Sequence, residues 1–394
     1  MAHDWQSIRS QYLHDPDQIY LNTGSWGVMP TPVYEDYVGL IRQLESNPTQ
    51  GRRPLLERLA ESRRALAGYL NIQARDLALL PNVTAALNMV VNGLDWAEGD
   101  EILTTDQEYG AILNTLDNAS KRWGVPVVKA EIPVPPESPA AILAPIEAAI
   151  TDQTRLLVCS HITTRTGMIL PIKEISELAH RHGVLVAYDG AHAPGMGPVD
   201  LAESDADFYG GNCHKWLCSP KGVGFLYANP SVQPLLHHLI VSWGYSPEGT
   251  VEVDGEPTIN SSPAMWGLGN WGTVDLPGQV ATGEAVRFQE EIGTEAIAAR
   301  GRELSGYVRD RVSNLPWIDI LSPSKPGLFG SITTIRLRGM GGKNLNKQLF
   351  ETYRITIPVF EEGEDASVRV STHLYNLPAE IDHLFKAITE IQSA

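Results

Sequence analysis

The sequence predicts an α/β protein in which helices cover a mostly parallel β-sheet, with a smaller α+β domain at the C-terminal end. The main observation is an alternation, between about residues 75 and 230, of apolar β-branched runs with segments of helical periodicity. Such an alternation is typical of βαβ units, which build parallel sheets. The apolar runs are continuous, as expected for strands buried on both faces. After about residue 280 the regular alternation ends, which indicates a second domain.

The first region contains six runs that we expect to be strands, because each is short, apolar and rich in β-branched residues. They are ILTTD (102–106), VPVVKAEI (125–132), RLLVCS (155–160), VLVAYD (184–189), DFYGG (207–211) and VGFLYA (223–228). Helical periodicity predicts helices between them at 109–123 and 172–183. The proline-rich segment 133–140 is expected to be a loop.

The C-terminal region is predicted to be a smaller α+β domain. Residues 281–312 have helical character, and three short apolar or amphipathic runs follow at 329–337, 355–360 and 367–372. The acidic segment 361–366 is expected to be a solvated loop. The chain ends in a predicted helix, because Ile381, Leu384, Phe385 and Ile388 recur at the spacing of one helical face.

Composition and charge exclude several classes of protein. A chain of 394 residues is long enough for two domains. The formal net charge of −17 argues against nucleic acids and anionic membranes as partners, because the field of the protein would repel both. The N-terminal stretch lacks the apolar region of a signal peptide, and no run approaches the length of a membrane span.

The three cysteines indicate neither disulfides nor a metal. An odd number of cysteines in a long chain does not form a disulfide framework. Cys213 and Cys218 lack CxxC spacing, and no second pair could complete a zinc site, so we expect no metal. A cytoplasmic enzyme with reduced cysteines is the simplest interpretation.

Polar residues follow several of the predicted strands, at the edge of a parallel sheet where ligands bind. Asp189 closes the run 184–189, and His214 and Lys215 follow the run 207–211. The segment NVTAALN (82–88) places small and hydroxyl residues where a helix begins, a position that favours a phosphate. A lysine for a Schiff base, a carboxylate for the ring nitrogen and a phosphate cradle are what pyridoxal phosphate needs.

The sequence also resembles a known family over nearly its whole length. The resemblance is to the class V aminotransferase superfamily of fold-type I pyridoxal-phosphate enzymes, above all to isopenicillin N epimerase-like proteins and cysteine/cystine C–S lyases. It implies a large cofactor-binding domain (15–275) with a sheet of seven-stranded type, and a small domain made of 1–14 and 276–394. The resembling motifs are YLNTGSWG (20–27), NVTAALN, GDEILTTDQEYGAIL (99–113), SHITTRTGMILPI (160–172), YDGAHAPG (188–195), GGNCHKWLCSPKGVGFLY (210–227) and RVSTHLYN (369–376).

The resemblance also implies roles for the residues at the reacting end of the cofactor. Lys215 would form the Schiff base and then move the Cα proton. Asp189 would pair with the pyridine nitrogen. His192 would lie near the phenolic oxygen, and Thr164 is a weaker candidate for that place. Lys221, the second lysine of the same motif, is interpreted as a turn residue.

Further roles concern the phosphate, the substrate and a neighbouring subunit. By the resemblance, Tyr109 would stack on the cofactor ring. Arg369 would bind the substrate α-carboxylate, with Asn22 beside it. Thr273 would reach the phosphate of a neighbouring subunit, which implies a homodimer with shared active sites. The phosphate itself would be held by Thr84, Ala85, Asn212 and His214.

The motifs leave the reaction open among epimerisation at Cα, β-elimination from a cysteine-like substrate and transamination, because removal of the Cα proton is common to all three. We favour an epimerase-like enzyme, with a C–S β-lyase as the alternative. A cysteine desulfurase is disfavoured, because no cysteine follows Cys218 in the C-terminal part. A non-catalytic protein of this fold would be expected to lose Lys215 or Asp189. A nicotinamide dehydrogenase would need a glycine-rich GxGxxG turn after a strand, and none is present.

Overall fold

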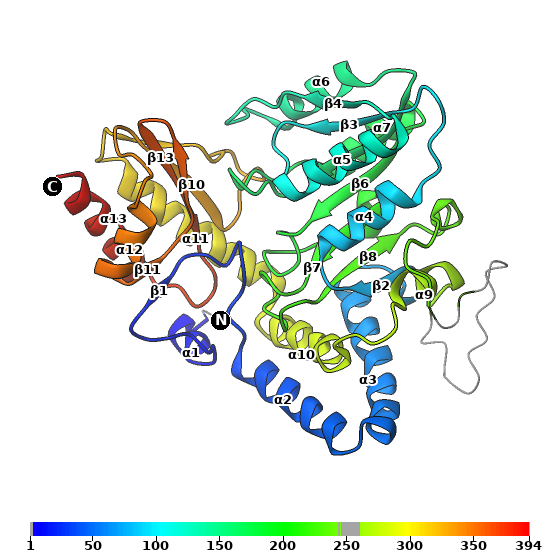
Figure 1. Ribbon diagram of the computed structural model, residues 1–394. Helices are drawn as coiled ribbons and strands as arrows, with labels where there is room; N and C mark the ends of the chain where they lie inside the picture. Colours follow the sequence, from blue (N-terminus) through cyan, green and yellow to red (C-terminus); the bar gives the residue numbers. More distant parts are fainter. Residues whose placement is uncertain (1–2, 243–244, 246–260, 394) are drawn as a thin grey trace.

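The large sheet of the protein has seven strands in the order β2-β8-β7-β6-β5-β3-β4 (Figure 1). The computed structural model describes residues 3–242, 245 and 261–393. Neighbouring strands are parallel except at β8, which runs antiparallel to β7 and β2. The strands are β2 (Leu77–Leu80), β3 (Glu101–Thr105), β4 (Val127–Ala130), β5 (Thr154–Ser160), β6 (Leu185–Gly190), β7 (Phe208–Asn212) and β8 (Gly224–Ala228).

All six predicted strands are present, and the predicted mostly parallel sheet is confirmed. The sequence analysis missed β2, whose four residues are all buried. This strand is too short to carry a periodic signal. It forms because its backbone pairs with β8, about 150 residues further along the chain.

Helices cover both faces of the large sheet, which explains why its strands are continuously apolar. Along β5, Leu156 and Val158 pack into one core cluster, while Leu157 and Cys159 pack into the other, because successive side chains point to opposite faces. The helices are α2 (Thr31–Ser46), α3 (Pro48–Tyr69), α4 (Val83–Gly93), α5 (Gly110–Trp123), α6 (Pro139–Ala149), α7 (Ile172–Arg181), α8 (Leu201–Ser204), α9 (Pro263–Gly269) and α10 (Leu276–Ile292), with short 3-10 turns at Ala74–Asp76 and Gln233–Leu235.

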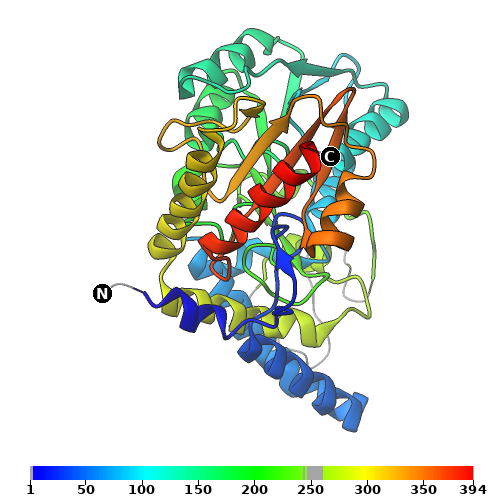
Figure 2. The same ribbon diagram turned by 90° about the vertical axis from the view of Figure 1, so that its left-hand side faces the viewer.

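The C-terminal part contains a four-stranded sheet of order β12-β13-β10-β9, in which all neighbours are antiparallel (Figure 2). The four residues predicted to form one face of the last helix are buried there, in a separate core. The loop predicted at 361–366 is wrong for most of its length, because Glu361 and Glu362 belong to β12 and pair with Ala366 and Asp365 of β13. Only residues 363–364 form the turn of this hairpin. The elements are β9 (Ile318–Ile320), β10 (Ile332–Leu337), β11 (Ile355–Thr356), β12 (Val359–Glu362), β13 (Asp365–Ser371), α11 (Thr294–Val312), α12 (Leu345–Tyr353) and α13 (Pro378–Gln392).

Two segments pack across the domain limits implied by the family resemblance. Strand β1 (Ile19–Tyr20) falls within the range given to the large domain, but it pairs with β11, and Leu21 is part of the C-terminal core. Helix α10 falls within the small-domain range, but it packs against α2 and α3. The domain limits therefore stay a prediction.

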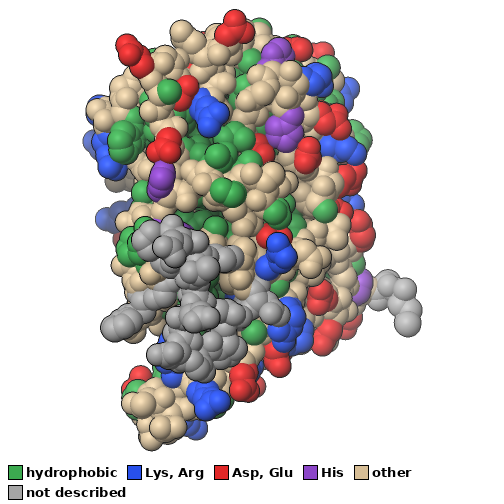
Figure 3. Space-filling model, turned by 90° about the vertical axis from the view of Figure 1, so that its right-hand side faces the viewer, with side chains coloured by type: hydrophobic (Ala, Val, Ile, Leu, Met, Phe, Trp, Pro, Cys, Tyr) green, Lys and Arg blue, Asp and Glu red, His purple; other side chains and the backbone are tan. Residues whose placement is uncertain are grey.

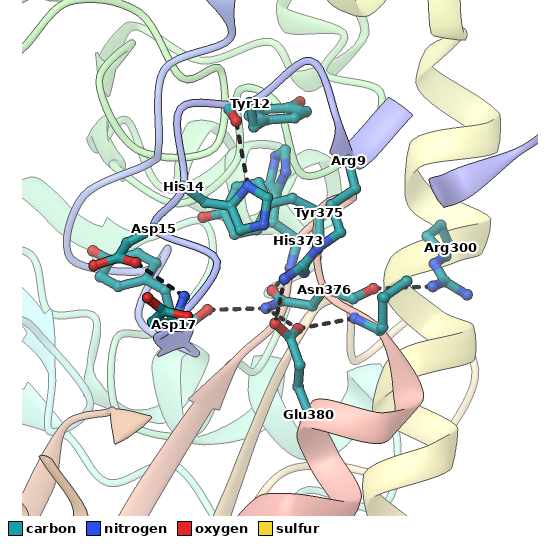
Figure 4. Close-up of polar contacts among 12 residues, drawn as sticks. Arg9, Tyr12, His14, Asp15, Asp17, Arg300, His373, Tyr375, Asn376 and Glu380 are labelled. Atoms are coloured by element: carbon teal, nitrogen blue, oxygen red, sulfur yellow. Dashed lines mark hydrogen bonds and ion pairs between the residues drawn. The ribbon is translucent and has the colours of Figure 1, made fainter. Parts of the chain in front are cut away.

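The N-terminal segment, with α1 (Trp5–Arg9), is tied to the segment that follows β13 (Figure 4). Arg9 forms an ion pair of 2.9 Å with Glu380 and also donates to the Tyr375 carbonyl. The Asn376 amide donates to Glu380 over 3.0 Å, and Arg300 of α11 donates to the Asn376 carbonyl over 3.0 Å. Side chains from three separate parts of the chain thus hold the segment that leaves β13, the strand that carries Arg369.

Among the described residues on the face seen in Figure 3, acidic and basic side chains are interspersed. Among the described residues, no helix combines the length and the apolar character that crossing a bilayer requires.

Candidate active site

The carboxyl ends of β5, β6 and β7 and the N-terminus of α4 border a cavity of about 280 Å³. Parallel strands end at the same edge of a sheet, so side chains that are far apart in the sequence meet there. Most of the predicted site residues line this cavity. They are Thr84, Tyr109, Thr164, Asp189, His192, Asn212, His214, Lys215 and Arg369.

Three predicted site residues do not line it. Asn22 contacts a residue of the cavity wall, because its Oδ1 accepts a hydrogen bond of 3.3 Å from Arg369. Ala85 donates its backbone N–H to the Asn82 side chain over 2.9 Å. Thr273 is exposed and borders a separate cavity of about 910 Å³. That cavity is larger, but neither Lys215 nor Asp189 lines it, so its size does not make it the site of the chemistry.

The Lys215 amine is placed to react with an aldehyde. Its Nζ lies 3.4 Å from His192 Nε2 and 5.9 Å from the centre of the Tyr109 ring. Burial lowers the pKa of Lys215 to about 8, although the Asp189 charge acts in the opposite direction. A substantial fraction of the amine is therefore neutral near physiological pH, and the neutral form is the nucleophile.

Asp189 is a buried carboxylate whose second oxygen remains for a ligand. It is the penultimate residue of β6, and its Oδ1 accepts the Ala191 N–H over 2.9 Å. Burial raises the pKa of Asp189, while the nearby Lys215 charge counteracts part of this rise. A protonated ring nitrogen at this carboxylate would compensate its burial.

Helix α4 offers donors for an anion at its N-terminus. The Asn82 side chain caps the helix, and Asn212 Oδ1 accepts the Val83 N–H over 2.9 Å. This contact leaves the Asn212 amide hydrogens free to face the cavity, next to Thr84. Donors at a helix N-terminus suit a phosphate, so the lysine, the carboxylate and this cradle together fit pyridoxal phosphate.

His214 is held at the same end of the cavity. Its Nδ1 donates to the Val223 carbonyl over 3.1 Å. Burial lowers the pKa of His214 to about 4. Because Nδ1–H is used by the carbonyl, contact of Nε2 with a phosphate requires a proton on that nitrogen, which a bound dianion would favour.

Arg369 is a buried guanidinium that contacts only neutral groups of the described chain. Its Nη1 donates to the Thr164 carbonyl and hydroxyl over 3.1 and 3.0 Å, and its Nη2 donates to Ser25 Oγ over 3.1 Å. Its Nε is buried without a partner. Burial lowers the pKa of Arg369 to about 10. An uncompensated buried cation of this kind favours an anionic ligand such as a carboxylate.

The sequence analysis missed a second buried carboxylate, Glu108, beside the site. It accepts hydrogen bonds of 2.6 Å from Thr105 and from Ser160, and Ser160 lines the cavity. Burial raises the pKa of Glu108 to about 7, although both hydrogen bonds act in the opposite direction. No spacing or motif marks this residue, because its partners come from two different strands.

Replacement Glu108→Gln is expected to remove a pH-dependent part of the stability. The pKa of Glu108 in the folded protein, about 7, lies above the ordinary value of 4.5 for a glutamate. The folded state therefore binds more protons than the unfolded state between these values, and stability falls as pH rises through this window. We expect the free energy of unfolding of wild type minus that of the variant, from urea titrations, to drop by up to about 3 kcal/mol from pH 4.5 to pH 7.

Glu98→Gln, the same replacement at an exposed position, is the matched control. A constant difference between wild type and Glu108→Gln over the same pH range would contradict the raised pKa.

The fold and the cavity define a pyridoxal-phosphate enzyme, and comparison with known proteins gives its family. The model for class V aminotransferases matches residues 20–384, so the chain belongs to this family. It is 36% identical to the isopenicillin N epimerase of Amycolatopsis lactamdurans, with 99% of each chain covered. It is also 36% identical to the isopenicillin N epimerase of Streptomyces clavuligerus, with 98% of each covered.

A solved structure shows the same fold. The cystine C–S lyase C-DES, in complex with its reaction product cysteine persulfide, matches with a TM-score of 0.83 and 25% sequence identity, covering 95% of this chain and 98% of that chain. Another structure of C-DES holds glycine covalently linked to the cofactor. These findings confirm the predicted fold, family and cofactor.

Proposed function

We propose that the protein removes and returns the Cα proton of an amino acid, as an epimerase. The observation that carries the proposal is that the Lys215 amine and the uncompensated Arg369 guanidinium line one cavity. An amino acid bound there has a partner for its amine end and a partner for its carboxylate, with Cα between them. The similarity to two isopenicillin N epimerases over nearly the full chain supports epimerisation in particular.

Four residues of the cavity have defined tasks in this proposal. Bound pyridoxal phosphate withdraws electrons from Cα and so acidifies its proton. Lys215, with a pKa of about 8, can take up and return a proton near neutral pH. Asp189 holds the positive charge of the ring nitrogen, Arg369 orients the carboxylate, and Thr164 holds Arg369 in place.

The second candidate is a C–S β-lyase, in which loss of the same proton is followed by departure of a sulfur group. The similarity to the cystine C–S lyase C-DES favours it as the alternative. Sulfur transfer to a protein thiol has less support. Cys159, Cys213 and Cys218 are all buried, none lines the cavity, and burial raises the pKa of Cys218 to about 12. Such thiols are poor nucleophiles.

A panel of amino acids in D₂O tests the function. Each enantiomer is incubated with the holoenzyme, and Cα deuterium, chirality, pyruvate and sulfide are measured. Epimerisation predicts deuterium at Cα in both enantiomers, starting from either one, without pyruvate. Formation of pyruvate together with sulfide would indicate a lyase instead of an epimerase. Formation of the oxo acid that corresponds to the substrate, without inversion at Cα and without sulfide, would indicate transamination.

We further propose that the enzyme is a homodimer in which Thr273 of one subunit completes the phosphate site of the other. The exposed position of Thr273, outside the cavity of its own chain, supports this. A cytoplasmic location stays a prediction from the sequence.

Mixing two variants that each lack one residue of the shared site tests this proposal. In a hybrid dimer of Lys215→Ala and Thr273→Ala, one of the two sites has both native residues. We expect Thr273→Ala alone to weaken cofactor binding by about tenfold, the cost of one charge-assisted hydrogen bond. The hybrid should regain tight binding and Cα exchange at one site per dimer. A fully active monomer in sedimentation experiments would contradict the proposal.

A further inference from the structure

Trp216, which follows Lys215 in the sequence, contacts His192 on the side of the imidazole that is turned away from Lys215. Trp216 is fully buried and is one of the largest side chains in the core. Its indole Nε1 donates a hydrogen bond of 3.1 Å to His192 Nδ1. His192 is itself buried and lines the cavity, whereas Trp216 does not.

This contact determines which ring nitrogen of His192 carries the hydrogen. An indole N–H only donates, so His192 Nδ1 must present its lone pair to Trp216. Burial lowers the pKa of His192 well below its usual range, and the charges of Lys215 and Arg369 act in the same direction. The imidazole is therefore neutral, and its hydrogen is on Nε2.

The other nitrogen faces the reacting groups. His192 Nε2 lies 3.3 Å from Thr164 Oγ1 and 3.4 Å from Lys215 Nζ. With its hydrogen on Nε2, the ring offers a donor at this end of the cavity. With the opposite tautomer it would offer a lone pair, which repels an anionic oxygen.

The indole is held in place from the opposite side. The Trp216 carbonyl accepts hydrogen bonds of 2.6 Å from Gln289 of α10 and 2.8 Å from His373 Nε2. The His373 ring lies 5.9 Å from the indole, centre to centre, and tilted by 30°. His373 belongs to the segment after β13 that Arg9 and Arg300 anchor (Figure 4). Packing against a fixed segment leaves the indole little freedom to turn away from His192.

We propose that Trp216 is a positioning residue that keeps His192 in the Nε2–H tautomer, so that His192 donates to the phenolic oxygen of bound pyridoxal phosphate. The inference rests on the proposed position of the cofactor ring, but on neither the substrate nor the reaction type. Removal of the indole N–H should therefore change the tautomer of His192 in the apoenzyme. It should also weaken the binding of pyridoxal phosphate, independently of any turnover.

The test uses full-length wild type and Trp216→Phe, which keeps an aromatic ring but removes the N–H. The matched control is Trp96→Phe, because the Trp96 indole donates a comparable hydrogen bond of 2.9 Å to the Val91 carbonyl, away from the cavity. Nitrogen-15 NMR of histidine-labelled apoenzyme reports the tautomer, and His192→Gln assigns the signal. Titration of apoenzyme with pyridoxal phosphate gives the dissociation constant, and absorbance against pH gives the pKa of the bound chromophore.

We expect Nε2–H in wild type and in Trp96→Phe, and loss of this single tautomer in Trp216→Phe. The dissociation constant of the cofactor should rise about tenfold in Trp216→Phe and less than about twofold in Trp96→Phe. The pKa of the chromophore should shift only in Trp216→Phe.

Nδ1–H in wild type would overturn the proposal, and this measurement needs no folded Trp216 variant. An unchanged tautomer and dissociation constant in folded Trp216→Phe would also overturn it. A failure of the epimerase proposal is distinguishable from a failure of this one. The epimerase proposal is tested by the reaction products formed from added amino acids, whereas the tautomer and the dissociation constant of the cofactor are measured without any amino acid.

Discussion

Replacement Lys215→Ala is expected to abolish exchange of the Cα proton, by more than about 10³-fold, because it removes both the amine that bonds to the cofactor and the base that moves the proton. The cofactor should still bind without a covalent bond, since Thr84 and Asn212, which line the cavity at the N-terminus of α4, are unaffected by the replacement. Borohydride reduction of wild type, followed by peptide mass spectrometry, should place the label on Lys215.

Lys221 supplies the matched control for this experiment. Its Nζ donates to the Gly27 carbonyl over 2.5 Å, and it does not line the cavity. Lys221→Ala should therefore retain the reducible bond on Lys215 and stay within a few-fold of wild-type activity. A label on Lys221, or exchange by Lys215→Ala near the wild-type rate, would refute the assignment of the Schiff-base lysine.

Replacement Asp189→Asn is expected to lower the rate by about 10²- to 10⁴-fold while leaving the fold intact. The amide oxygen can still accept the Ala191 N–H, which keeps the end of β6 in place. A neutral amide cannot hold the ring nitrogen protonated, so the cofactor loses most of its capacity to withdraw electrons from Cα. The measurements are kcat and the absorbance of the bound cofactor.

Asp207→Asn is the matched control for Asp189→Asn, because Asp207 is also a buried aspartate but does not line the cavity. It is buried just before β7, where its carboxylate accepts the Val186 N–H over 2.8 Å and contacts His180 over 2.9 Å, away from the cavity. Asp207→Asn should lower stability but retain kcat in the protein that remains folded. Equal losses of kcat in both variants would mean that burial of a carboxylate, rather than its contact with the cofactor, governs the rate.

Site residues could be predicted from the sequence where they directly follow a strand that the sequence itself reveals. Asp189 and Lys215 follow apolar runs that are long enough to be recognised, and the ends of parallel strands meet at one edge. The composition of the segment 82–88 predicts the start of a helix. Family resemblance added Arg369, whose strand lies in the C-terminal part. Its distance along the chain from Thr164 and Ser25, which it contacts, leaves no local signal.

The sequence by itself determined six of the seven strands of the large sheet, the buried face of α13 and the presence of a lysine and a carboxylate near strand ends. These features follow from the backbone period of strands and helices, which is local. Only the tertiary structure decided that β2 joins the sheet and that Glu108 is buried between Thr105 and Ser160. It also decided that no carboxylate of the described residues pairs with Arg369, and that Trp216 contacts His192. Each of these depends on which side chains packing brings together from distant segments, and the hydrogen bonds and desolvation that result shift the protonation of the site.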